Sequence, residues 1–379
     1  MAETPVKVAV VGTGFGQKVH IPGLQAHHRT EVVAVYHRDL AQAQAIAAAH
    51  RIPHACDSVE AIVALPEVQA VTVATPPFLH YDQAKTVLEA GKHLLLEKPT
   101  ALSGAEAEAI AKLARDGRRP APEGHRSLIA TLDFEFRFVP AWQYLAERLT
   151  EGYVGNLRFV NITWTVPGRA DPSRAWNWYS RQDQGGGALG AFASHSFDYI
   201  TWLFGPIQRL CARLSTAIPQ RPDAAGTLQP VDADDTCSLI LDLQNGAPCQ
   251  VAISSITYAG RGHWVEVYGD GGTLVLGSDN LGDYVHGFKL WGSQGGAPLA
   301  ELPIPDRLQF PTTYSDGRIA PFVRVVNHWV SDMDRGQMTA PSIWDGVRSQ
   351  HLMDLAHRSH RENRWVEVPN PLSQTLSQV

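Results

Sequence analysis

The sequence has few cysteines, no paired metal-ligand spacing and no long apolar run. Its four cysteines are scattered, with no C-x-x-C pair: Cys56, Cys211, Cys237 and Cys249. Reduced thiols of a cytoplasmic protein are therefore expected rather than a disulfide framework. None of the 16 histidines has ligand spacing with another histidine or cysteine, so no metal is expected. No apolar stretch is long enough for a membrane span, and the polar N-terminus is too short for a signal peptide.

Charge is also sparse. Charged residues make up 18% of the chain, the net charge is −6, and no basic run is present. A nucleic-acid partner is therefore not expected. Hydrophobic residues make up 44% of 379 residues, which is typical of a well-packed protein with two domains. No internal repeat or low-complexity segment is visible.

A glycine turn near the N-terminus is the most informative motif. Residues 6–11 form an apolar run typical of a buried parallel strand, and a second such strand follows at 31–36. Between them a turn and a helix start resemble G-x-G-x-x-G, although Gln17 replaces the third glycine. Such a turn brings a pyrophosphate to a helix N-terminus. The predicted cofactor contacts here are Gly12, Thr13, Gly14, Phe15 and Gly16.

The pattern of strands and helices changes along the chain. Strand–helix alternation in the first third predicts a doubly wound parallel sheet. The later segments alternate with period two, which predicts a large, mostly antiparallel sheet with one more polar face, either solvated or packed on another subunit. Helices are expected at 321–333 and 342–360. The predicted strands are 68–74, 92–97, 130–137, 158–165, 235–243, 249–256 and 263–269. We therefore predict an α/β Rossmann domain over 1–133 and an α+β domain for substrate binding and oligomerisation over 134–379.

Two loops follow strands of the parallel sheet and face the expected ligand crevice. Glu97 and Lys98 end one strand, and Lys98 is favoured as a residue beside the nicotinamide over a solvated surface charge. Thr75, Pro76 and His80 follow the neighbouring strand. A cofactor-lining role is favoured for them, although the prolines are also compatible with a plain turn and His80 with a packing role.

The glycine triplet 185–187 leads into a helix that carries His195 and Asp198. A lone histidine on a helix is more often structural, but the glycines and the carboxylate three residues on favour catalysis, with Asp198 orienting the imidazole. Trp176, Trp178 and Tyr179 precede the triplet. They are equally compatible with stacking on a sugar ring and with an aromatic core.

With these motifs the sequence resembles the Gfo/Idh/MocA oxidoreductase family over nearly its whole length. The resemblance rests on 12–14, 97–99, 134–140, 185–198 and the closing Pro321-Phe322, Asp345-Gly346 and Ser359 pattern. It implies a nicotinamide cofactor and hydride transfer with a sugar, polyol or related carbonyl compound. It also implies that Lys98 is the active-site lysine and His195 the catalytic acid/base. The chain departs from the family pattern at Ala191, where an aspartate is usual, and at Ala193, where glycine is usual.

Cofactor choice is predicted from the end of the second strand. An NAD-binding domain usually has a carboxylate there for the ribose hydroxyls, but this chain has His37 followed by Arg38. Arg38 has donors for a 2′-phosphate, so NADP is favoured over NAD. The alternative is that Arg38 is solvated and Asp39 caps the next helix, with either cofactor bound.

The sequence therefore predicts an NAD(P)-dependent oxidoreductase of a carbohydrate-like substrate, with a homo-oligomeric assembly, either a dimer or a tetramer. Its expected substrate residues are Lys98, Arg137, Trp176, Trp178, Tyr179 and His195. Two other classes remain open: a nucleotide-binding regulator without efficient turnover, and a partner-binding protein that uses the polar sheet face.

Overall fold

The computed structural model describes residues 4–121 and 124–369, and its contacts divide the chain into two compact units. Unit 1 contains the chain up to Glu135 together with Thr312–Gln350; unit 2 contains Phe136–Pro311 and the chain from His351. The first boundary lies close to the predicted one at 133/134. The predicted division placed 312–350 in the second domain, whereas the structure places these residues in unit 1.

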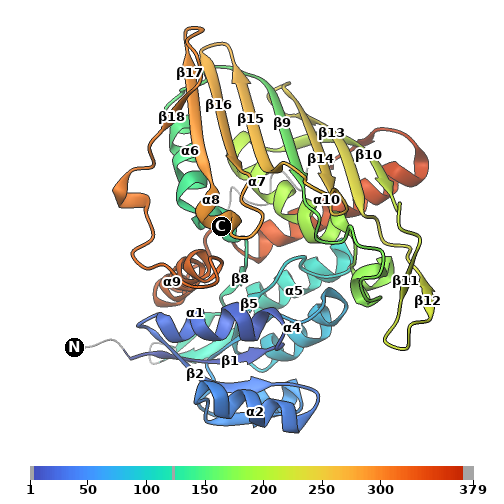
Figure 1. Cartoon of the computed structure of the whole chain (residues 1–379). Coiled ribbons are helices and arrows are strands. Elements are labelled where there is room, and N and C mark those ends of the chain that lie inside the picture. The colour runs from blue at the N-terminus through green and yellow to red at the C-terminus, as the bar shows by residue number, and fades with distance from the viewer. Residues whose placement is uncertain (1–3, 122–123, 370–379) are drawn as a thin grey trace. The chain divides into compact units, whose positions relative to one another are not determined.

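Unit 1 is built on a six-stranded parallel sheet with the order β3-β2-β1-β4-β5-β8 (Figure 1). Every residue of β4 and β5 is buried, as expected for parallel strands that are covered on both faces. The strands are β1 (Val6–Val11), β2 (Thr30–Tyr36), β3 (His54–Cys56), β4 (Ala70–Val73), β5 (His93–Leu96) and β8 (Ala130–Leu132). The helices are α1 (Ile21–Ala26), α2 (Leu40–His50), α3 (Val59–Ala64), α4 (His80–Glu89), α5 (Gly104–Asp116), α9 (Ile319–Arg335) and the start of α10 (Ile343–Glu362). A separate antiparallel pair joins β6 (Arg118–Ala121) to β7 (Gly124–Ser127). The predicted doubly wound sheet is confirmed.

The segment 312–350 belongs to unit 1 because its apolar side chains complete that unit. In α9, Phe322 stacks on His20 with ring centroids 4.2 Å apart. At the start of α10, Ile343 and Val347 join the apolar core of the parallel sheet. The helical periodicity of the sequence predicted both helices, but periodicity does not state which core a helix covers.

The predicted strand 130–137 is wrong beyond Leu132. The chain leaves the sheet there and forms a 3₁₀ turn over Glu135–Phe138. The alternation that suggested a longer strand has another cause: Phe134 packs in the core of unit 1, whereas Phe136 packs in the core of unit 2. Alternate apolar residues here serve two cores rather than one face of a sheet.

Unit 2 is built on a nine-stranded sheet with the order β18-β17-β16-β15-β9-β14-β13-β10-β19. All neighbouring strands pair antiparallel except β14 and β9, which are parallel, so the predicted mostly antiparallel sheet is confirmed. Asn245 and Gly246 form the hairpin turn between β13 and β14. The strands are β9 (Leu157–Thr165), β10 (Ile207–Ser215), β13 (Thr236–Leu243), β14 (Pro248–Ser254), β15 (Gly262–Gly269), β16 (Gly272–Ser278), β17 (Lys289–Gln294), β18 (Ala300–Leu302) and β19 (Val366–Glu367).

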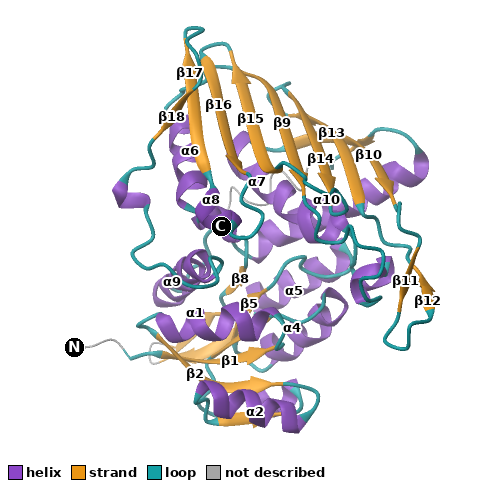
Figure 2. Cartoon of the chain, viewed as in Figure 1, coloured by secondary structure: helices purple, strands orange, loops and turns teal. Residues whose placement is uncertain are grey.

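Helices cover one face of this sheet. Trp142 of α6 (Pro140–Thr150), Phe197 of α7 (Ser194–Phe204) and Met353 of α10 share its apolar core, and these helices lie on the same side of the sheet in Figure 2. Along β13 and β14 buried and exposed residues alternate, so the opposite face is the more polar one. A short helix α8 (Tyr284–Gly287) and a hairpin of β11 (Gln220–Pro222) and β12 (Leu228–Pro230) complete the unit.

Within 4–121 and 124–369, no helix combines the length and apolar character that a membrane span needs. The four cysteines are free thiols.

Candidate active site

The turn after β1 holds two glycines in different situations. Gly12 has φ +102°, and a Cβ there would come within 2.6 Å of the Ala74 backbone, so the fold itself requires this glycine. Gly14 is exposed, and a Cβ there would meet no heavy atom within 4 Å. The fold therefore does not require glycine at 14. An open backbone at this position suits the close approach of a dinucleotide pyrophosphate.

Gly16 takes the place of the third glycine in the motif. A Cβ at Gly16 would lie 3.2 Å from Val10 Cγ1, so glycine lets the helix pack closely on β1, as the third glycine does in the full pattern. A π-helical turn, Gly16–His20, begins there and continues into α1. This strand–turn–helix arrangement fits a dinucleotide, because its backbone N–H groups lie at the carboxyl end of β1.

The end of β2 presents no carboxylate to a ligand. Asp39 caps α2, accepting hydrogen bonds from the N–H groups of Ala41 and Gln42 at 2.9 and 3.4 Å. His37 Nδ1 accepts from the Asp39 N–H at 3.0 Å. Arg38 is exposed and makes no hydrogen bond or ion pair with any described residue.

His80 ties together the two predicted cofactor loops. It is fully buried, with Nδ1 2.8 Å from the Pro99 carbonyl oxygen and Nε2 2.8 Å from the Thr75 carbonyl oxygen. Burial lowers the pKa of His80, although the two carbonyl contacts oppose that shift. Its side chain therefore fixes the loops after β4 and β5 from within, while Thr75 and Pro76 are half-buried.

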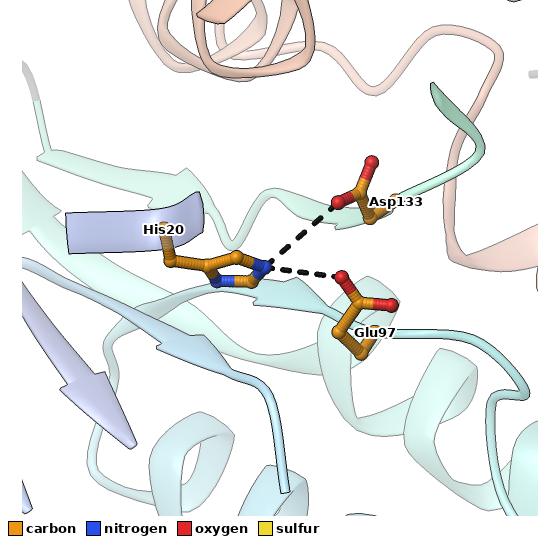
Figure 3. Close-up of side chains that lie close together, drawn as sticks. All are labelled: His20, Glu97 and Asp133. Atoms are coloured by element: carbon orange, nitrogen blue, oxygen red, sulfur yellow. Dashed lines mark hydrogen bonds and ion pairs between the residues drawn. The ribbon is translucent and has the colours of Figure 1, made fainter. Parts of the chain in front are cut away.

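A buried polar network that sequence reasoning missed lies beside Lys98. His20 Nε2 is 3.0 Å from Glu97 Oε1 and 3.8 Å from Asp133 Oδ2, and Figure 3 shows the imidazole directed at both carboxyl groups. Burial opposes ionisation of Glu97, but its contacts with His20 and the charge of Lys98 lower its pKa overall. Burial and the nearby charges of Glu97 and Glu135 raise the pKa of Asp133 well above its usual range. The two carboxyl groups therefore differ: the pKa of Glu97 is lowered, and that of Asp133 is raised.

These three side chains also have the spacing of a metal site, since their ligating atoms lie within 4.8 Å of one another. Besides burial and the two charges, a hydrogen bond with Glu97 raises the pKa of Asp133. We therefore describe the cluster as a buried network of one imidazole and two carboxyl groups. No sequence spacing pointed to it, because its members come from the π-helical turn before α1 and from the positions directly after β5 and β8.

Lys98 lies directly after this network. Its backbone N–H donates to Glu97 Oε2 at 3.2 Å, so the same carboxylate that binds His20 also holds the peptide of Lys98. Strands β5, β4 and β1 are consecutive neighbours in one parallel sheet, and Lys98 therefore lies at the same edge as Gly12 and Gly14. Ligands of open α/β sheets bind at this edge.

In unit 2, the glycine triplet packs against Asp234, which is another residue that sequence reasoning missed. Gly187 has φ +100°, and a Cβ there would lie 2.5 Å from Asp234 Oδ1. Asp234 Oδ2 accepts from the N–H of Leu189 at 2.9 Å, where the helical segment that carries His195 begins. Burial raises the pKa of Asp234 to about 7.

His195 is the second residue of α7 and is buried. Its ring contacts Phe136 edge-on, with centroids 4.9 Å apart. Asp198 has a partner that the sequence did not suggest: its two oxygens accept from Arg137 Nε at 3.0 Å and Nη2 at 2.5 Å. Arg137, predicted to contact substrate, is engaged with a carboxylate inside the unit because the 3₁₀ turn after β8 directs it toward α7. The support of His195 by Asp198 stays a prediction.

The aromatic segment before the triplet is held in place by backbone contacts. Trp176 Nε1 donates to the Pro230 carbonyl at 2.8 Å, which pins it to the β11–β12 hairpin. Trp178 and Tyr179 lie with ring centroids 5.6 Å apart. The Tyr179 carbonyl accepts from the N–H of Gly187 at 3.2 Å, so this segment packs directly on the glycine triplet.

The predicted site residues thus form two groups, each ordered inside its own unit. The glycine turn, the β2 end and the loops after β4 and β5 belong to unit 1; the triplet, His195, Asp198 and the aromatic segment belong to unit 2. This combination defines a two-domain oxidoreductase with a dinucleotide-binding Rossmann domain. Residues 6–123 match the model of the oxidoreductase family NAD-binding Rossmann fold, and residues 146–368 match that of its C-terminal α/β domain. The chain belongs to the Gfo/Idh/MocA family and is an NAD(P)-dependent dehydrogenase.

Relatives extend over the whole chain. An uncharacterized oxidoreductase of Synechocystis sp. is 51% identical and covers 100% of both chains. Levoglucosan dehydrogenase of Pseudarthrobacter phenanthrenivorans is 27% identical over 80% of this chain and 81% of its own. A solved structure of levoglucosan dehydrogenase in complex with NADH and L-sorbose matches with a TM-score of 0.84 at 23% identity, over 96% of this chain and 99% of that one.

Proposed function

We propose that the protein transfers a hydride between a nicotinamide cofactor and an alcohol or carbonyl group of a sugar or polyol. The observation that carries the proposal is the common sheet edge of Lys98 and the Gly12–Gly14 turn. The backbone of Lys98 is held at that edge by the buried Glu97 carboxylate, and its ammonium group is suited to an oxygen that gains negative charge. The names of relatives that act on sugars and polyols support the substrate class.

The nicotinamide, when bound, supplies or accepts the hydride. His195 takes the proton of the substrate hydroxyl, or returns it in the reverse direction. Lys98 donates a hydrogen bond to the same oxygen and stabilises its developing charge. Asp198 neutralises Arg137, and this ion pair stabilises α7, the helix that carries His195.

Two substitutions test these roles. Lys98→Ala and His195→Ala should each lower kcat by roughly two to four orders of magnitude, while folding and cofactor affinity change little. Arg358→Gln, an exposed change on α10, is the matched control and should keep full activity. Near-normal turnover of both variants on an identified substrate would refute the assignment.

For the cofactor we propose NADP. Asp39 is engaged as a helix cap, His37 stands where a ribose-binding carboxylate is usual, and the exposed Arg38 has all its donors available. A guanidinium fork suits a 2′-phosphate. A levoglucosan dehydrogenase structure contains NADH, so titration of both cofactors is the decisive measurement. Arg38→Ala should weaken NADP binding about tenfold or more and leave NAD binding unchanged; tighter NAD binding with no effect of the variant would reverse the choice.

A regulatory role without turnover is the second candidate, and Ala191 favours it because the family's usual aspartate is missing there. Ala191→Asp distinguishes the two. If the wild type binds cofactor but turns over no sugar or polyol, and Ala191→Asp acquires activity, the regulator is the better description. A wild type with turnover excludes it.

We also propose that the polar face of the unit 2 sheet forms a symmetric interface between copies of the chain. It is broad, and Ile240 and Tyr268 add exposed apolar surface to it. A monomer by light scattering at micromolar concentration would contradict this, and a pull-down through the same face tests the partner-binding alternative.

A further inference from the structure

Three arginines gather beside the aromatic segment of unit 2: Arg169, Arg174 and Arg221. Arg221 is 2% exposed and donates to the carbonyl oxygens of Asp171 and Arg169 at 2.7 and 2.5 Å. Arg174 is exposed and donates to the Gly168 carbonyl at 2.5 Å. The group therefore brings three positive charges together in a chain whose net charge is −6.

Arg169 differs from Arg137, another buried arginine of this unit, in having no carboxylate partner. Arg137 and Arg169 are both 8% exposed, and Arg137 is neutralised by Asp198. Among the described residues no aspartate or glutamate lies within ion-pair distance of Arg169, Arg174 or Arg221. Burial and the charges of its two arginine neighbours lower the pKa of Arg169 to about 10. Buried charges in proteins are normally paired, because an unpaired one is costly.

The donors of Arg169 are also largely unused. Its guanidinium makes one side-chain hydrogen bond, from Nη2 to Ser180 Oγ at 3.1 Å, and its Cζ lies over the Tyr179 ring, 4.6 Å from the ring centre. None of its nitrogens is among the fully buried polar atoms that lack a partner, so the remaining N–H groups keep contact with solvent. A guanidinium that lies over an aromatic ring and has N–H groups open to solvent suits a bidentate oxyanion.

Arg169 lies next to the segment that presents His195. Tyr179, under its guanidinium, accepts a hydrogen bond from Gly187, and a Cβ at Gly186 would overlap the same Tyr179 carbonyl. The glycine triplet then leads directly into the helical segment of His195. Arg169 thus packs, through Tyr179, on the turn that leads to the proposed acid/base His195.

We infer that Arg169, with Arg174 beside it, binds an oxyanion of the substrate, so that the enzyme acts on a negatively charged sugar: a sugar acid or a sugar phosphate. The inference rests on the proposed function and narrows its substrate class. An oxyanion would supply the counter-charge that Arg169 lacks, while Tyr179 stacks on the cation from its other side.

Matched substrates test the inference in the full chain with its cofactor. Glucose, glucuronate and glucose 6-phosphate differ in charge but share the ring, and the last two distinguish a carboxylate from a phosphate. We expect kcat/KM for one of the charged sugars to exceed that for glucose at least tenfold. Arg169→Gln should raise KM for that sugar roughly tenfold to a hundredfold with a smaller change in kcat, and Arg169→Lys should restore part of the loss. Arg358→Gln is the control for general charge effects.

Several outcomes overturn the inference. Equal kcat/KM for neutral and charged sugars, or an unchanged KM in a folded Arg169→Gln protein, refutes it and leaves the proposed function standing. If no sugar is turned over, the proposed function fails, and calorimetry with glucuronate and with inorganic phosphate decides the anion site alone. Binding by the wild type that is lost in Arg169→Gln supports the site, and no binding by the wild type refutes it. If Arg169→Gln does not fold, Arg169→Lys serves in its place.

Discussion

Two alanine substitutions only two residues apart should separate folding from cofactor binding. At Gly12 the φ of +102° is unfavourable for any residue with a Cβ, and the added atom would meet the Ala74 backbone at 2.6 Å. Backbone strain of this kind costs about 1–3 kcal/mol, and the overlap with an immobile main chain adds to it. We expect Gly12→Ala to lower the free energy of unfolding by about 3 kcal/mol or more.

Gly14→Ala should behave in the opposite way. A Cβ there meets nothing within 4 Å, so the unfolding free energy should stay within about 0.5 kcal/mol of the wild type. The new methyl group would stand between the backbone and a pyrophosphate and weaken hydrogen bonds to charged oxygens, each worth about 1.5–3 kcal/mol. The dissociation constant of the cofactor should therefore rise about tenfold to a hundredfold.

Urea unfolding without cofactor measures the first quantity, and calorimetric titration with NADP and NAD measures the second. The reasoning fails if Gly14→Ala binds both cofactors as tightly as the wild type, because the open backbone would then serve no ligand. It also fails if Gly12→Ala is as stable as the wild type.

Three further results are expected. Burial raises the pKa of Asp234 from an ordinary value of 3.8 to about 7 in the folded protein. Protonation of this carboxyl group therefore favours the folded state. The resulting stabilisation is fully present below pH 3.8 and is lost as the pH rises to 7. Asp234→Asn should therefore gain stability relative to the wild type across that window, by at most about 4 kcal/mol, and equal pH profiles of unfolding would contradict the assignment. His20→Phe keeps the stack on Phe322 but leaves the buried Glu97 carboxylate without its hydrogen bond, at a cost of about 3 kcal/mol. The double variant with Glu97→Gln should lose less than the sum of the two single losses, and strict additivity would show that the two residues are not coupled.

The sequence predicted what repeats along the chain and missed what depends on contacts between distant segments. The strand before Gly12 and the alternation in 235–256 are local patterns, and both sheets follow from them. The network of His20, Glu97 and Asp133 joins residues up to 113 positions apart, and nothing in their spacing predicts it. Asp234 is similar, because its hydrogen bond to the N–H of Leu189 spans 45 positions. Arg137 was expected at the substrate. Its pairing with Asp198 depends on the turn over Glu135–Phe138, where the alternation of apolar residues had predicted a strand.

The return of residues 312–350 to unit 1 determines when that unit can finish folding during synthesis. The ribosome releases the six parallel strands first. The side chains that complete their core, Ile343 and Val347, and the ring that stacks on His20, Phe322, emerge only after eight of the nine strands of the unit 2 sheet have been made. A nascent chain that stops near residue 311 would expose the apolar surfaces that these residues cover. The N-terminal unit therefore depends on translation of most of the chain, and it cannot be treated as an autonomous module that ends at Glu135.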